Sequence, residues 1–218
     1  MVLVLGIDEA GRGAVVGPLV VGGAVCEEKD LEKLKALGVK DSKLLTPEQR
    51  EKIYPKLKKI LKDFVTLKIS AQQIDELRKK DNLNVIEAKH MAQIIKAMEA
   101  DFAYVDAPQV STEKFKNVLL ALAKNHTKII SENYADKKYV IVGAASILAK
   151  VDRDAEIEKI KKLVGENFGV GYPHDMDTRK FVEKCLAEKK HLEWIRHSWE
   201  TVKEMNEARE IKSLKKFG

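Results

Sequence analysis

Five short apolar stretches, interleaved with helical patterns, constrain the fold of this chain more than any other feature. The stretches cover residues 2–7, 17–26, 65–70, 102–107 and 127–133. Between and after them, apolar residues recur with the spacing of amphipathic helices over residues 29–37, 46–64, 71–80, 84–100, 111–124 and 140–163. Strands that alternate with helices predict a layered α/β body, and the tail after residue 177 predicts a helical attachment.

Local signals refine three of these segments. Thr46 is placed to cap the helix over residues 46–64, with Pro47 at its first position, and Pro55 is expected to kink or divide that helix. The small residues at positions 143–145 would let the helix over residues 140–163 pack tightly.

Composition narrows the class of protein. The net charge of +6 favours a polyanionic partner, with nucleic acid as one candidate. Only seven of the 40 basic residues are Arg, and a surface rich in Lys and Glu resembles that of heat-adapted proteins. Cys26 and Cys185 lie far apart and outside any C-x-x-C motif, which favours neither a disulfide framework nor a zinc site. No stretch reaches the roughly 18 apolar residues of a membrane span, and no signal sequence precedes the first strand, so we expect a cytoplasmic protein without membrane contact.

Acidic residues follow two of the predicted strands. Asp8 and Glu9 come directly after the first apolar run, and Asp106 lies at the end of the fourth. If these strands are parallel neighbours, Asp8 and Asp106 share the carboxyl edge, where open α/β sheets bind ligands. An ideal strand directs Glu9 to the opposite face, unless the turn that begins at Gly11 brings it round. Asp136 is a fourth acid, expected on a loop at the same rim.

Clustered carboxylates repel one another unless a cation lies between them. Oxygen ligands suit hard divalent ions, so Mg²⁺ or Mn²⁺ is the expected occupant. The alternative is that these acids are turn or cap residues, the commoner role of an Asp after a strand. Residue chemistry alone leaves both interpretations open.

Seven blocks of sequence together resemble type 2 ribonuclease H in its archaeal form. They occur in that family's order and read GIDEAGRG (6–13), GPLVV (17–21), VKDSKLLTPEQR (39–50), YVDAP (104–108), AASILAKVDRD (144–154), GYPHD (171–175) and SWETV (198–202). The resemblance implies an α/β fold, a ribonuclease H-like mixed five-stranded sheet flanked by helices, with a C-terminal helical segment. It implies a catalytic domain over residues 1–173 and a helical substrate-binding segment over residues 174–218.

The same resemblance implies an activity. The protein would be an endoribonuclease that cuts RNA in RNA–DNA hybrids and cuts 5′ of single ribonucleotides embedded in duplex DNA, leaving a 3′-hydroxyl and a 5′-phosphate. Two Mg²⁺ or Mn²⁺ ions would serve catalysis. The implied catalytic and metal-binding residues are Asp8, Glu9, Asp106 and Asp136. The implied substrate-binding residues are Gly11, Arg12, Gly13 and Tyr172 at the ribose, and Lys43, Ser146 and Lys150 along the phosphates.

Simpler interpretations stand beside these roles. A G-x-G sequence commonly just shapes a turn, and surface lysines are commonly solvated. A DNA-directed nuclease of the same superfold, such as a junction resolvase, and a catalytically silent hybrid-binding module are the rival functions. We expect a monomer.

The sequence departs from the family pattern around the site. Ala14 stands where proline is usual, and Asn133 and Tyr134 replace a His-Lys pair. Val140 and Val170 stand where proline and serine are common. Loss of the positive charge at position 134 leaves the metal affinity and pH optimum open, and Val170 would alter contacts beside Tyr172.

The chain end IKSLKKFG faintly resembles the sliding-clamp peptide of archaeal relatives. Leu214 and Phe217 keep the hydrophobic spacing, whereas Ile211 and Gly218 replace the usual glutamine and final aromatic residue. We favour a frayed basic tail, with weak clamp contact as the alternative.

Overall fold

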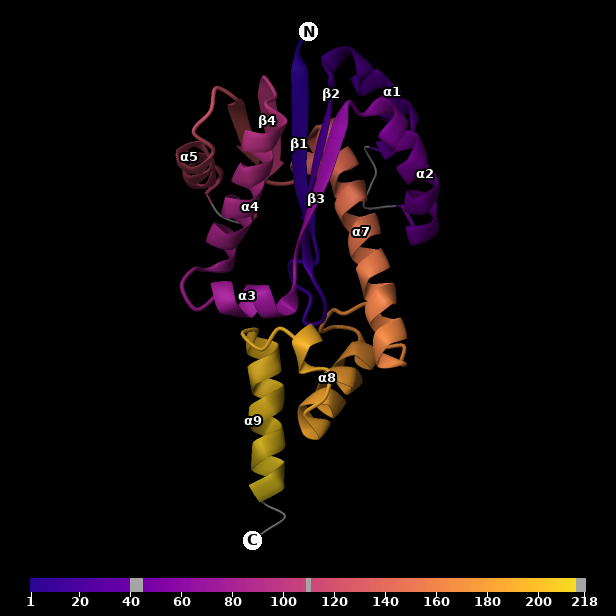
Figure 1. Cartoon of the computed structure of the whole chain (residues 1–218), viewed down its shortest axis with the longest axis vertical. Coiled ribbons are helices and arrows are strands. Elements are labelled where there is room, and N and C mark those ends of the chain that lie inside the picture. Colours follow the sequence, from indigo (N-terminus) through magenta and orange to yellow (C-terminus); the bar gives the residue numbers. More distant parts are fainter. Residues whose placement is uncertain (40–44, 109–110, 215–218) are drawn as a thin grey trace. The chain divides into compact units, whose positions relative to one another are not determined.

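The computed structural model describes residues 1–39, 45–108 and 111–214 (Figure 1). The chain forms two compact units, each built from three separate stretches. Unit one contains Met1–Ala10, Val20–Leu67 and Asn82–Asp152, and unit two contains Gly11–Leu19, Lys68–Asp81 and Arg153–Gly218. The division between residues 173 and 174 that the sequence suggested stays a prediction.

A mixed five-stranded sheet in the order β3-β2-β1-β4-β5 forms the centre of unit one. Its strands are β1 (Leu3–Ala10), β2 (Leu19–Glu27), β3 (Asp63–Ile69), β4 (Phe102–Asp106) and β5 (Lys128–Glu132). β1 is antiparallel to β2 and parallel to β4, and β4 is parallel to β5. All five predicted strands are confirmed, and so is the parallel neighbourhood of the first and fourth.

Helices cover both faces of this sheet. They are η1 (Glu28–Asp30), α1 (Leu31–Ala36), α2 (Pro47–Ile60), α4 (Leu83–Met98), α5 (Thr112–Ala123), α6 (Ala135–Lys138) and the first part of α7 (Val140–Val164). α4 and α5 lie on one face, and α1, α2 and α7 lie on the other (Figure 1). Both faces of β1 and β2 are therefore buried, which accounts for their nearly continuous apolar sequences.

The helix boundaries confirm one local prediction and correct another. Thr46 caps α2 in a reciprocal capping box with Gln49, as expected. Pro55 lies inside α2 and does not divide it, so that part of the expectation was wrong, while a kink at Pro55 stays a prediction. Because Pro55 is exposed, its ring points to solvent, and water can reach the carbonyl that its missing N–H leaves without an intrahelical partner.

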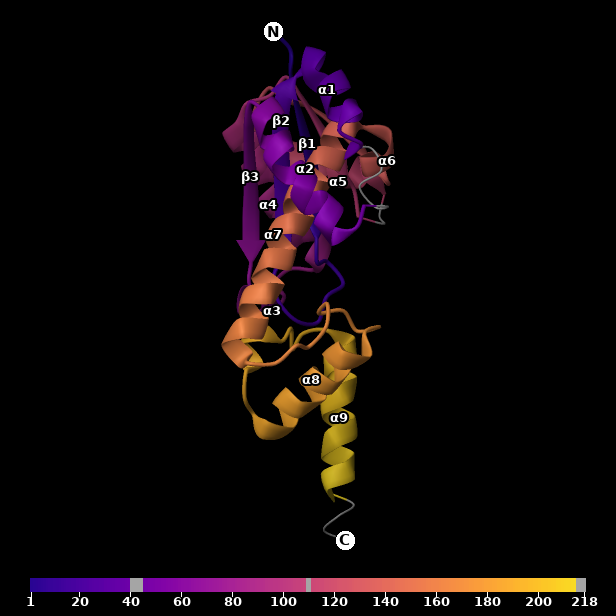
Figure 2. The same ribbon diagram turned by 90° about the vertical axis from the view of Figure 1, so that its right-hand side faces the viewer.

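Unit two is mainly helical, with α3 (Ala71–Leu77), the last part of α7, α8 (Met176–Glu188), η3 (Leu192–Trp194) and α9 (Glu200–Leu214). Figure 2 gives a second view of α3, α8 and α9. Its apolar core includes Val15, Val16 and the stacked pair Phe168 and Phe181, whose ring centroids are 4.7 Å apart. The predicted helical tail is confirmed, with an irregular stretch between α8 and α9. Within the described residues, no helix has the length and apolar character needed to cross a bilayer.

Candidate active site

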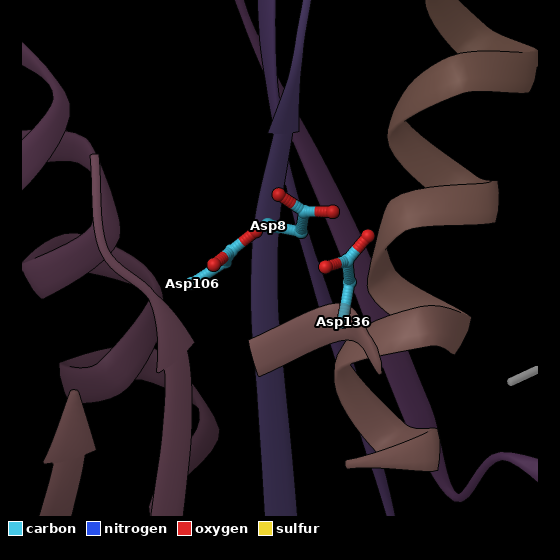
Figure 3. A group of neighbouring side chains, drawn as sticks. All are labelled: Asp8, Asp106 and Asp136. Atoms are coloured by element: carbon cyan, nitrogen blue, oxygen red, sulfur yellow. The ribbon is translucent and has the colours of Figure 1, made fainter. Parts of the chain in front are cut away.

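Three carboxylates converge at the carboxyl end of β1 and β4. Asp8 lies on β1, Asp106 ends β4, and Asp136 lies on α6. Each offers one oxygen such that all three oxygens lie within 4.8 Å of one another. Figure 3 shows the three side chains directed toward a common point. Asp8 and Asp136 are almost fully buried, at 5% and 1% exposure, while Asp106 is half-buried.

Asp106 stabilises α6, the short helix that carries Asp136. An Asp106 carboxylate oxygen accepts a 2.9 Å hydrogen bond from the Ala135 N–H, which opens α6. The Asn133 amide donates to the carbonyls of Ala107 and Pro108 at 3.0 and 3.2 Å, and so ties the end of β4 to the same loop. Asp136 therefore lies on a short helix rather than on the loop that the sequence suggested, and that expectation was wrong. Satisfying the first N–H of the helix stabilises it despite its single turn.

Two strand glycines let α7 approach Asp8 closely. A Cβ at Gly6 would lie 2.2 Å from the Ile141 carbonyl oxygen, and one at Gly22 would lie 2.5 Å from that of Ala145. Gly6 is two residues before Asp8 on the same face, and Gly22 is its partner across the β1–β2 pair. The close packing expected of the small residues at 143–145 thus depends equally on glycines in the strands.

The close approach of α7 places two of its polar side chains next to Asp8. Ser146 is fully buried, and its hydroxyl donates a hydrogen bond to Asp8. The same hydroxyl accepts a 2.8 Å hydrogen bond from the Lys150 ammonium group one turn later on α7. The Glu9 backbone N–H also donates to Asp8, at 2.8 Å.

Burial and repulsion between carboxylates raise the pKa of Asp8, whereas the contacts just described lower it. Burial, followed by the nearby Asp106 carboxylate, raises the pKa of Asp8 from 3.8 to about 7. The Ser146 hydroxyl, the Lys150 charge and the Glu9 N–H lower the same pKa, but by less. A carboxylate kept in such surroundings is strongly stabilised by a cation.

The donor set fits a hard divalent cation. Carboxylate oxygens are the ligands that Mg²⁺ and Mn²⁺ prefer, and three of them meet here from separate elements. No His or Cys belongs to this group in the described part of the chain, which disfavours softer metals.

A glycine turn follows β1 and belongs to unit two. The Ala14 N–H donates to the Gly11 carbonyl at 3.2 Å, so Arg12 and Gly13 are the central residues of a β-turn. Gly11 has a φ of +83°, and a Cβ there would lie 2.7 Å from the Pro18 carbonyl oxygen. Glycine at position 11 is therefore required by the fold itself.

Tyr172 lies on a tightly fastened loop of the same unit. The Arg153 guanidinium is centred 4.5 Å from the Tyr172 ring, and it donates a 2.6 Å hydrogen bond to the Val170 carbonyl. The Thr178 hydroxyl accepts from the Gly171 N–H at 2.9 Å. Asp175 accepts from the Val170 N–H, which lowers the pKa of the Asp175 carboxyl. These contacts hold Tyr172 in one orientation relative to Arg153.

Comparison with known proteins identifies the family. The model of the ribonuclease HII family matches residues 5–202. The chain belongs to the ribonuclease HII family. A ribonuclease HII from Pyrococcus horikoshii is 44% identical over 207 residues, which cover 94% of this chain and 93% of that protein. The family makes this protein a metal-dependent endoribonuclease that acts on RNA–DNA hybrids.

Solved structures support the same assignment. The crystal structure of ribonuclease H2 from Pyrococcus horikoshii matches with a TM-score of 0.87 and 42% identity, over 94% of this chain and 98% of that chain. The RNase HII in a PCNA:RNase HII complex from Archaeoglobus fulgidus matches with a TM-score of 0.85 and 38% identity, over 91% and 96%. The ribonuclease H-like fold predicted from the sequence is thereby confirmed.

The structure brings some of the predicted site residues of this ribonuclease HII together and not others. Asp8, Asp106 and Asp136 converge, and Glu9 is not among the converging carboxylates. β1 continues through Ala10, so strand alternation directs Glu9 away from the face of Asp8. Its metal-binding role stays a prediction.

The predicted substrate-binding residues divide between the two units. Ser146 and Lys150 lie beside Asp8 in unit one, and Ser146 is turned inward, so a phosphate contact by either residue stays a prediction. The residues at positions 11–13 and Tyr172 lie in unit two. Lys43 falls outside the described residues.

Two departures from the family pattern have visible local consequences. Tyr134 has a left-handed φ of 58° directly before α6, is 53% exposed, and lies 5.4 Å from the Lys137 ammonium group. A positive charge therefore remains in this region through Lys137. Val170 is half exposed, and its carbonyl and N–H bind Arg153 and Asp175. The effect of its side chain on contacts beside Tyr172 stays a prediction.

Sequence reasoning missed Gly22, which lets α7 approach Asp8 and so positions the site without forming it. It carries no motif of its own. A glycine inside an apolar strand is nevertheless a recognised sign of close backbone approach, and Gly22 lies in such a run.

Proposed function

We propose that this ribonuclease HII cuts 5′ of a ribonucleotide, both in continuous RNA–DNA hybrids and at single ribonucleotides embedded in duplex DNA. The products would carry a 3′-hydroxyl and a 5′-phosphate. The convergence of Asp8, Asp106 and Asp136 is the observation that carries the proposal. Three neighbouring carboxylates can hold divalent cations, and hydrolysis of a phosphodiester needs that positive charge beside the phosphate. Ribonucleotide removal from DNA and primer processing are the roles that such an activity serves.

We assign the metal site to the same three carboxylates. The family resemblance adds Glu9 as a fourth ligand, which would require its side chain to turn toward the face of Asp8. Two divalent ions, Mg²⁺ or Mn²⁺, would supply an activated water and stabilise the leaving oxygen. Within the protein, Ser146 donates a hydrogen bond to Asp8 and itself accepts one from Lys150. Asp106 accepts from the first N–H of α6. These contacts keep the ligand oxygens in place and reduce the ordering required when ions bind.

The glycine turn and Tyr172 are our candidates for ribose recognition. Only the 2′-hydroxyl distinguishes RNA from DNA along the sugar. Gly13 is exposed, and a Cβ there would meet no described protein atom within 4 Å. Packing does not demand glycine at this position, and close approach of a ligand to the backbone does explain it. Arg12, Lys43 and Lys150 are proposed to contact phosphates.

A second proposal concerns the chain end. We propose weak contact with a sliding clamp through Leu214 and Phe217, the latter outside the described residues. A similar protein is known in a PCNA:RNase HII complex, and the chain end keeps part of a clamp-binding pattern. Capture by the cognate clamp of wild-type protein, but not of a Leu214→Ala, Phe217→Ala double variant, is the expected result. Equal capture of both, or of neither, would contradict the contact.

One assay tests the main proposal. A labelled DNA duplex with a single ribonucleotide is incubated with Mg²⁺, Mn²⁺ or a chelator, beside an all-DNA duplex of the same sequence. We expect one cut 5′ of the ribonucleotide with a divalent ion, none with chelator, and an intact all-DNA duplex. Cleavage of both duplexes would favour a DNA-directed nuclease, and binding without cleavage would favour a silent binding module.

A further inference from the structure

A fully buried arginine lies beneath the glycine turn. Arg196, in the irregular stretch between α8 and α9, is 0% exposed. Its Nε donates to the Gly17 carbonyl at 3.0 Å and its Nη1 donates to the Arg12 carbonyl at 3.1 Å. The Trp199 ring lies 4.9 Å from its guanidinium carbon. One side chain thus bridges both ends of the loop over residues 12–17.

The backbone around Arg196 anchors the rest of this loop. The Arg196 N–H donates to the Val15 carbonyl at 2.9 Å, and the Gly17 N–H donates to the Trp194 carbonyl at 2.9 Å. These bonds hold residues 15 and 17, and the Arg196 side chain adds a direct hydrogen bond to the peptide between Arg12 and Gly13.

The Arg12–Gly13 peptide can direct either its carbonyl or its N–H outward, but not both. A peptide bond is planar and trans, so the Arg12 carbonyl and the Gly13 N–H point in opposite directions. Arg196 holds the carbonyl toward the protein interior, which turns the Gly13 N–H outward. Gly13 is exposed and has open space beside its Cα.

We infer that Arg196 is a positioning residue for ribose selectivity, holding the Arg12–Gly13 peptide so that its N–H faces the 2′-oxygen of the substrate. The inference rests on the proposed function of the glycine turn. A buried guanidinium is costly, and an apolar side chain would suffice if packing were its only task. The planar fork of arginine can reach two carbonyls at once, whereas lysine presents a single charged nitrogen.

Affinity ratios test this inference. In a cleavage-inactive Asp8→Asn parent with Mg²⁺ present, affinities are measured for a duplex with one ribonucleotide and for the matched all-DNA duplex. We expect the parent to prefer the ribonucleotide, and Arg196→Met to lower that preference about tenfold while the affinity for DNA stays the same. Arg196→Lys, which keeps the charge, should retain an intermediate preference.

Phe181→Leu is the matched control, because Phe181 belongs to the apolar core of unit two, where it stacks on Phe168. It should lower the melting temperature and leave the preference unchanged. A parent without any preference would contradict the ribose recognition in the proposed function. A parent with a preference that both Arg196 variants retain in full, or that Phe181→Leu loses equally, would overturn the present inference alone. If Arg196→Met does not fold, Arg196→Lys decides the question.

Discussion

Asp8 and Gly22 face each other directly across the antiparallel pair of β1 and β2. The absence of a side chain at Gly22 lets the backbone of α7 come within contact distance, and α7 carries the Ser146 hydroxyl to Asp8. A strand glycine therefore supports the Asp8 carboxylate through the helix that it admits.

Gly22→Ala should damage the metal site as well as stability. A Cβ at this position would lie 2.5 Å from the Ala145 carbonyl oxygen, so α7 must shift. We expect a loss of about 1–3 kcal/mol in the free energy of unfolding, typical of overpacking, together with weaker Mg²⁺ binding. Urea denaturation and calorimetric titration with Mg²⁺ measure the two effects.

Gly23→Ala is the matched control on the opposite face of β2. Its Cβ would lie 2.5 Å from the Cγ2 methyl of buried Ile94 on α4, so this variant is overpacked as well. It should also lose stability, but it does not displace α7 and should leave Mg²⁺ affinity unchanged. Equal Mg²⁺ affinities in both variants would show that the approach of α7 does not matter to the metal site.

The raised pKa of Asp8 predicts a pH-dependent cost in the metal-free protein. The folded state binds the Asp8 proton more tightly than the unfolded chain between pH 3.8 and about pH 7, so this contribution to stability falls as pH rises through that window. Asp8→Asn removes it. In chelator, the variant should gain about 2 to 4 kcal/mol relative to wild type between pH 3.5 and pH 8.

Urea denaturation of both proteins at several pH values measures this difference. Excess Mg²⁺ should stabilise wild type more than Asp8→Asn at pH 8, because the ion binds the ionised carboxylate. Asp177→Asn, at an exposed position, is the control. A difference between wild type and Asp8→Asn that does not change with pH would contradict the proposed cost.

Tyr172 and Arg153 should act together on single ribonucleotides. The Arg153 guanidinium lies over the Tyr172 ring and donates to the Val170 carbonyl, so Arg153→Met removes both contacts from the Tyr172 loop. We expect Tyr172→Ala and Arg153→Met each to reduce cleavage at one embedded ribonucleotide about tenfold more than cleavage of continuous hybrid. The double variant should be little worse than either single variant. Equal losses on both substrates would count against this role, as would fully additive effects.

Much of the fold could be predicted from the sequence because its signals are local. Apolar runs placed all five strands, and the ends of β1 and β4 placed Asp8 and Asp106 at one edge once the strands were taken as parallel. The sequence placed Asp136 at the same rim but on a loop, because its helix depends on a hydrogen bond from the Ala135 N–H to Asp106, 29 residues earlier in the chain than Ala135. Arg196 lies 179 residues from Gly17, and no local pattern reveals such a contact. That α2 continues through Pro55 was not predicted, because the exposure of Pro55 depends on how α2 packs.

The central claim is that the converging carboxylates hold the ions that cut RNA, and the Asp8→Asn variant tests it most directly. Cleavage and binding are measured on the same labelled duplex containing one ribonucleotide, with saturating Mg²⁺ and excess enzyme. We expect affinity within about threefold of wild type and a cleavage rate at least a thousandfold lower, a loss of about 4 kcal/mol in transition-state stabilisation. Near-normal Mg²⁺-dependent cleavage by Asp8→Asn would contradict the account.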